Sequence, residues 1–217
     1  MPSSDFASHD PDFSREQIDQ CARIIDGLRK INSKIVRLGG SLDALTSAGD
    51  QVDALLDSLA EVTQARAMES FRFEFDPNQP NGVLPFNAAT GEFNPIAPSM
   101  EMAVEGTTLV ADCKFSNCHE SAPDTVQGGL VAAVFDELLA IAMMGKGKAG
   151  PTLWLKVTYL KPAPLCETLR FEVDVDAIEG KKFAGRGSCY HGDRKISEVE
   201  CLMLGSYDIP IVGGSPE

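Results

Sequence analysis

The amino-acid sequence predicts an α+β fold, in which an antiparallel sheet wraps around one long apolar helix and a helical arm precedes them. Helical patterns occupy residues 1–75, a Pro-, Asn- and Gly-rich segment covers 76–99, and residues 100–217 combine one apolar helix with several β-type runs. One long helix followed by consecutive strands with short turns is typical of α+β proteins. We therefore predict an N-terminal helical arm, a linker loop and a main domain with these boundaries.

The composition limits the classes of protein to consider. The chain has 217 residues, 43% of them hydrophobic, which suffices for a full core, and its net charge of −13 disfavours nucleic acid as a partner. Apolar runs stay well short of the roughly 20 residues that span a bilayer, and the N-terminus lacks the pattern of a secretion signal. We expect no membrane association and a cytoplasmic protein.

The six cysteines follow no disulfide-scaffold spacing, and we expect free thiols. Cys113, Cys118 and His119 lie close together in sequence, but no second pair of ligands follows them. We therefore expect no metal site.

The arm is predicted to contain two helices. Ser14 and Gln17 have capping-box spacing, and apolar residues then recur at helical intervals from Ile18 to Ile35, before a glycine pair. A second helical pattern covers residues 50–69. The apolar faces of both helices must be buried against the main domain or another copy of the chain.

The linker loop is too rich in turn-forming residues for regular structure, and it is long for an idle connection. The main domain then alternates strand patterns with turn signals. The predicted strands cover residues 100–104, 107–115, 152–160, 169–178, 183–190 and 196–204.

The central helix is the most informative segment. It opens on Gly128 and Gly129 and is apolar nearly all round, yet it carries Asp136 in its middle. A charge in such a place is paired or functional. The first N–H groups of the helix have no intrahelical acceptor, and glycine lets a ligand oxygen approach them closely.

Four stretches in order carry a family resemblance across about residues 91–204. They are residues 94–99, residues 120–137 with the pattern G-G-x-x-x-x-x-x-D-E, residues 152–165 with T-x-x-x-x-V-x-Y-x-x-P-x-P-L, and the strand segment Glu198-Val199-Glu200. They resemble the hotdog-fold acyl-CoA thioesterases. The specific likeness is to the PaaI-like branch of the 4-hydroxybenzoyl-CoA thioesterase superfamily, which includes proteins similar to thioesterase superfamily member 4.

The resemblance implies hydrolysis of a thioester by water, with Asp136 as the catalytic carboxylate. In this family that residue acts as a general base on water or as a nucleophile, and the sequence leaves both open. The backbone N–H of Gly128 would hold the thioester carbonyl oxygen. Thr152 falls where relatives place a hydroxyl that orients the water, although it also fits an ordinary strand threonine.

Helix geometry adds a requirement. Gly128 and Asp136 are eight residues apart, or about 12 Å along a helix, too far to reach one carbonyl. The aspartate must therefore meet a glycine from a second chain, which predicts a homodimer or a dimer of dimers. Neighbouring side chains are about 100° apart around a helix, so Glu137 faces elsewhere and is expected to be a structural or interface acid.

We expect Gln127, Gly129, Glu120 and Lys181 to contribute to substrate binding. Gln127 replaces the usual histidine of the motif but keeps a hydrogen-bonding side chain. Glu120 begins a segment in which the motif's glycines are replaced, near the expected pocket mouth. Lys181 belongs to a group of basic residues in the last third of the chain that could face an anionic ligand, or could simply be solvated.

These observations favour an acyl-CoA thioesterase that needs no cofactor, with coenzyme A entering as part of the substrate. The alternative is a non-catalytic hotdog module that binds acyl-CoA or serves as a scaffold. A hotdog dehydratase is disfavoured, because its best-known branches pair a histidine with the carboxylate.

Overall fold

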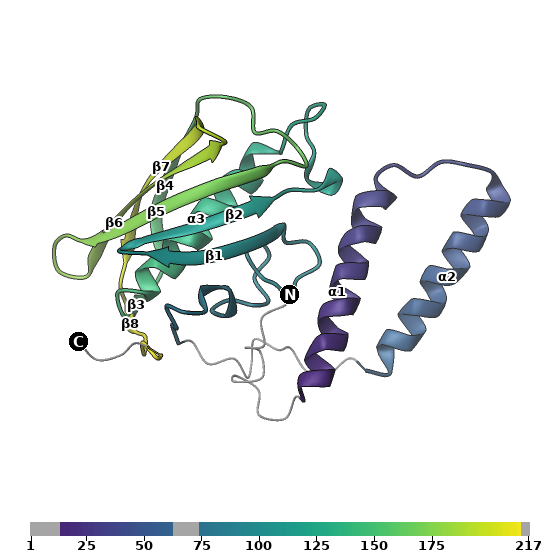
Figure 1. The fold of residues 1–217 in the computed structure, drawn as a ribbon, viewed down its shortest axis with the longest axis horizontal. Helices are drawn as coiled ribbons and strands as arrows, with labels where there is room; N and C mark the ends of the chain where they lie inside the picture. The colour runs from purple at the N-terminus through teal and green to yellow at the C-terminus, as the bar shows by residue number, and fades with distance from the viewer. Residues whose placement is uncertain (1–13, 63–73, 214–217) are drawn as a thin grey trace.

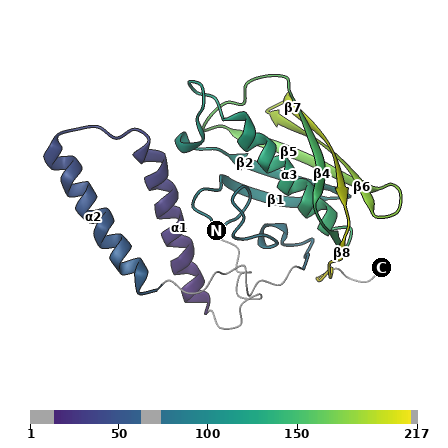
Figure 2. The ribbon, with the colours of Figure 1, turned by 180° about the vertical axis from the view of Figure 1, so that it is seen from behind.

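The structure is a computed structural model, which describes residues 14–62 and 74–213. One six-stranded antiparallel sheet curves around helix α3, Gly128–Met144, and a helical arm stands to one side (Figures 1 and 2). The strand order is β1-β2-β5-β6-β7-β4. The strands are β1 Ser99–Glu105, β2 Thr108–Lys114, β4 Thr152–Tyr159, β5 Thr168–Ala177, β6 Lys182–His191 and β7 Arg194–Leu204. The predicted α+β class is confirmed.

The core lies between α3 and the inner face of the sheet. Phe135 of α3 and Phe171 of β5 are fully buried and meet edge to face, with ring centroids 4.9 Å apart. β6 approaches the helix closely at Gly185, where an added Cβ would lie 2.7 Å from the Cδ2 atom of Leu139. Glycine is therefore the residue that lets the sheet close around the helix here.

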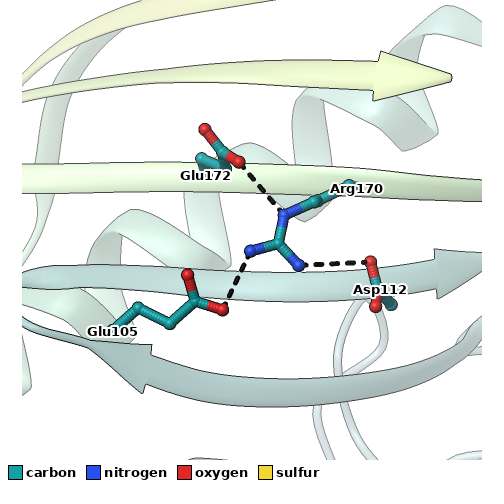
Figure 3. Close-up of polar contacts among 4 residues, drawn as sticks. All are labelled: Glu105, Asp112, Arg170 and Glu172. Carbon is teal, nitrogen blue, oxygen red and sulfur yellow. Dashed lines mark hydrogen bonds and ion pairs between the residues drawn. The ribbon is translucent and has the colours of Figure 1, made fainter. Parts of the chain in front are cut away.

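The outer face of the sheet is polar. Arg170 of β5 lies among three carboxylates, 2.9 Å from Glu105, 3.0 Å from Glu172 and 3.9 Å from Asp112 (Figure 3). These contacts raise the pKa of Arg170, through Glu105 first and then Glu172. Because β5 alternates buried and open positions, apolar residues face α3 and charged residues face outward.

The arm contains α1, Arg15–Ile35, and α2, Leu42–Ala60. The predicted capping box of α1 is present, with the Ser14 hydroxyl accepting from the Gln17 amide and the Gln17 side chain accepting from the Ser14 amide. α1 contacts the main domain, whereas α2 stands apart from it and has no buried residue (Figure 1).

The predicted bounds of the second helix were wrong at its start. α2 begins at Leu42, well before residue 50, because the Ser41 side chain caps it by accepting from the Ala44 amide, and Gly49 is tolerated inside the helix. Residues 61–62 form a turn rather than helix, and residues 63–69 lie outside the described residues.

The loop before β1 has the irregular structure that was predicted, apart from the short 3-10 helix η3, Pro80–Gly82. Asn81 fixes the loop to β1 by donating to the Met100 carbonyl and accepting from the Met102 amide. The 3-10 helix η4, Asn117–His119, and two short strands were not predicted. Strands β3, Lys148–Ala149, and β8, Tyr207–Asp208, pair only with each other, and two-residue strands leave no sequence pattern.

Replacing Phe135 with alanine should reduce the free energy of unfolding by about 3–5 kcal/mol, because it removes a fully buried ring and leaves a cavity. Urea unfolding followed by circular dichroism measures this. Ile178→Ala is the matched control, since Ile178 is 57% exposed, and its effect should stay within about 0.5 kcal/mol. Equal unfolding midpoints for the two variants would contradict the packing described above.

Candidate functional site

Asp136 lies on the side of α3 that faces strand β4. The Thr152 hydroxyl, at the first residue of β4, donates a hydrogen bond of 2.8 Å to the Asp136 carboxylate. Burial is the largest cause that raises the pKa of Cys201, on β7, to about 11, and the charge of Asp136 adds to it. The structure therefore brings together two of the three predicted catalytic residues, Asp136 and Thr152.

Gln127, Gly128 and Gly129 form the first turn of α3. The Gln127 side chain caps the helix by accepting from the Leu130 amide at 2.8 Å. A Cβ at Gly129 would lie 2.9 Å from that side-chain oxygen, so glycine leaves room for the cap. The amides of Gly128 and Gly129 occupy the first two helical positions, which have no acceptor within the helix.

Tyr159, which sequence reasoning missed, holds the same turn from the other side. Its hydroxyl donates to the Gly128 carbonyl at 2.7 Å, and its ring lies against the glycine. A cavity of about 360 Å³ beside this turn is lined by Gly128, Tyr159 and Lys161, among others. No local pattern distinguishes this tyrosine, because its partner is 31 residues away in sequence.

A single chain does not unite Gly128 with Asp136. Asp136 is hydrogen-bonded to the first residue of β4, and Gly128 to the last residue of β4. The two groups therefore lie toward opposite ends of that strand. Both residues belong to one continuous helix, so eight residues separate them by about 12 Å along its axis.

The other two predicted substrate-binding residues have their hydrogen bonds outside these two groups, although Glu120 pairs with Val126 next to the first turn of α3. Glu120 accepts from the Asp124 amide at 2.8 Å and so stabilises its own loop. Lys181 is exposed in the turn between β5 and β6, and its carbonyl accepts from the Gly205 amide. Strand β7 separates this turn from β4, so the structure does not bring Lys181 to Asp136 within one chain.

Glu137 faces away from Asp136, as helix geometry predicts, and interacts with the Asn87 side chain. Burial is the largest cause that raises the pKa of Glu137, the nearby charge of Asp136 adds to it, and the hydrogen bond with Asn87 opposes it. Glu137 also lines an apolar cavity beneath α1, which the sequence did not reveal.

His119 is a structural residue. It is buried, its Nδ1 accepts from the Ser116 amide at 2.9 Å, and its Nε2 lies 3.0 Å from the Ile96 carbonyl. Within residues 14–62 and 74–213, no group of His, Cys, Asp and Glu side chains has an arrangement that could hold a metal ion. The cysteines are all free, as the sequence predicts.

Known proteins share this architecture. Residues 124–198 match the family model of the thioesterase superfamily. A solved thioesterase superfamily protein superimposes with a TM-score of 0.73 at 23% identity, over 85% of this chain and 94% of that one. The hotdog fold is thereby confirmed. The superimposed 85% of this chain is more than residues 76–217 alone make up. Part of the helical arm therefore also has a counterpart in that protein.

Shorter proteins match about half of the chain. A hypothetical thioesterase from Streptococcus pneumoniae, solved with coenzyme A, is 16% identical over 51% of this chain and 91% of its own, with a TM-score of 0.48. Thioesterase superfamily member 2 from Mus musculus is 17% identical over 52% of this chain and 92% of its own, with a TM-score of 0.47. No helix among the described residues has the length and apolar character needed to cross a membrane.

Replacing Glu137 with glutamine should change the pH dependence of stability. Because its pKa is raised, the folded protein keeps the proton between the ordinary glutamate pKa and the raised value, while the unfolded chain has released it. Stability therefore falls as pH rises through that window. Glu137→Gln should be more stable than the unmodified protein at pH 8, and this difference should shrink as pH falls toward 4.

Thermal unfolding at several pH values measures the difference. A gap between the two proteins that stays constant from pH 4 to pH 8 would show that Glu137 is not the titrating group.

Proposed function

Since residues 124–198 belong to a thioesterase-superfamily domain with the hotdog fold, we propose that the protein is an acyl-CoA thioesterase that converts an acyl thioester and water to a free acid and coenzyme A. The observation that carries the site assignment is the hydrogen bond from Thr152 to Asp136. This bond holds a carboxylate by a hydroxyl donor on the side of the mostly apolar helix α3 that faces β4.

The proposed reaction needs only water and the groups of this site. Asp136 takes a proton from water while the water oxygen bonds to the thioester carbonyl carbon, and the carbonyl oxygen becomes an oxyanion. The intermediate then collapses, the carbon–sulfur bond breaks, and the coenzyme A thiolate takes the proton from Asp136. Direct attack by Asp136, giving an anhydride that water cleaves, is the other route open to this carboxylate.

Thr152 has a defined part in the first route. Its hydroxyl hydrogen is directed at Asp136, so its lone pairs remain available to accept a hydrogen bond from the attacking water. The Gly128 amide, at the positive end of α3, is suited to stabilise the oxyanion.

The site is completed by a second copy of the chain in this proposal. β4 is the last strand of the sheet, and its outer edge has no strand partner among the described residues. Four large apolar residues on or just after it are 44–52% exposed: Leu153, Trp154, Tyr159 and Leu160. An open strand edge with exposed apolar side chains is characteristic of an interface.

Antiparallel pairing of two β4 edges across a twofold axis gives the required geometry. It sets the first residue of one β4 beside the last residue of the other. Asp136 lies at the first and Gly128 at the last, so each aspartate meets the partner subunit's Gly128. We propose a homodimer, alone or as half of a tetramer, that works in the cytoplasm, where free thiols are usual.

Replacing Asp136 with asparagine should lower kcat at least about 100-fold, because it removes the base or nucleophile but keeps the shape of the side chain. Release of free thiol from a panel of acyl-CoAs measures turnover. Asp112→Asn, on the outer face of the sheet, is the matched control and should keep full activity. Tight binding without turnover in the unmodified protein would instead identify a non-catalytic acyl-CoA-binding module.

Two inactive variants should restore activity when mixed. Gly128→Pro removes the amide donor at a helix position that proline favours, and the extended backbone of Gln127 (ψ 124°) suits a following proline. A heterodimer of Gly128→Pro and Asp136→Asn then contains one intact site. Gly128→Ala, which keeps the amide, should stay active. Failure of the mixed and refolded variants to recover turnover would show that both groups act within one chain.

A further inference from the structure

A cavity of about 480 Å³ lies between α1, the loop before β1 and the side of α3 next to Asp136. Its volume falls within the range of small-molecule sites. Most of its lining residues are apolar and come from all three segments, among them Ile35, Val36, Ala89, Ile96, Leu130 and Ala133.

The apolar residues of this lining are open to solvent to an unusual degree. Ile35, Val36 and Ile96 are 50, 54 and 58% exposed around one cavity. Clustered exposed aliphatic side chains of this kind mark a surface that binds something apolar. The lining contains no Lys or Arg, so the cavity does not suit the phosphate groups of coenzyme A.

The cavity lies beside the face of α3 that carries the carboxylate of the proposed site, although Asp136 itself does not line it. On α3, Ala133 is three residues before Asp136 and therefore about 60° from it around the helix axis, toward the cavity. Its side chain is small. In the proposed site an acyl chain that starts at the reacting carbonyl would pass Ala133 to enter the cavity.

The wall formed by α1 is held in place by hydrogen bonds to the main domain. Arg29 donates to the Gly91 and Asn94 carbonyls at 2.9 and 3.1 Å, and Asn32 donates to the Pro95 carbonyl at 2.9 Å. From the other side, Asn117 donates to the Ser33 hydroxyl at 3.2 Å. These bonds fix Ile35 and Val36, at the end of the same helix, above α3.

We propose that this cavity binds the aliphatic acyl chain of the substrate, with α1 as its outer wall. The arm then selects substrates by chain length. This inference rests on the proposed function. The raised pKa of Glu137, with burial as its largest cause, agrees with an apolar surrounding.

Calorimetry tests the proposal by measuring the affinity of the protein for non-hydrolysable thioether analogues of acyl-CoA with chains of two to twelve carbons. Each methylene that enters the cavity should strengthen binding about fourfold until the cavity is full. Val36→Trp should remove most of this gain and leave the two-carbon analogue unchanged. Val36→Ala should extend the gain to longer chains.

Leu38→Trp is the matched control, because Leu38 is 63% exposed in the loop just after α1 but does not line the cavity. It should keep the chain-length profile, and thermal unfolding checks that all variants are folded. The proposal would be overturned if the dependence of affinity on chain length were the same in the unmodified protein, Val36→Trp and Val36→Ala. It would also be overturned if affinity did not depend on chain length. Because binding is measured without turnover, inactivity toward acyl-CoA would overturn only the proposed hydrolysis.

Discussion

Burial of one side of α3 against the sheet is the constraint on which the rest of the structure depends. Phe135, Leu138 and Leu139 are fully buried, and their position fixes the rotation of the helix about its axis. Asp136 must then face β4, where Thr152 donates to it. The same rotation places the first turn of α3 beside Tyr159. The site is therefore positioned by hydrophobic packing rather than by its own polar contacts.

The same packing divides the proposed site between two ends of β4. A helix long enough to fill the core separates Gly128 from Asp136 by more than one thioester group can bridge. In the antiparallel dimer that we propose, the open edge of β4 and its exposed apolar residues are covered, and the two parts of the site come together. Dimer formation would then give β4 a strand partner and give each Asp136 the Gly128 amide of the other subunit. The arm adds a separate element, because α1 covers the side of α3 that the sheet leaves open.

The parts that the sequence predicts are those determined by local patterns. The α1 capping box, the six main strands and the apolar character of α3 arise from neighbouring residues. The angle between Asp136 and Glu137 follows from helix geometry alone. The start of α2 was missed because Gly49 weakens the helical pattern before residue 50.

Other features depend on residues far apart in the chain. Tyr159 acts on a turn 31 residues earlier, and the apolar cavity is assembled from three separate segments. The charge of Lys181 did not indicate that it lies in the turn between β5 and β6, and its part in substrate binding stays a prediction. Such features require the tertiary structure, whereas the family resemblance led to Asp136 and Thr152 as members of one site.

The most direct test of the central claim is an experimental structure of the protein with a non-hydrolysable acyl-CoA analogue that keeps the carbonyl group. The account predicts a dimer in which the carbonyl oxygen lies within about 3.1 Å of the Gly128 amide of one subunit, with the Asp136 carboxylate of the other subunit facing the carbonyl carbon. A carbonyl bound away from Asp136, or a site completed within a single chain, would contradict it.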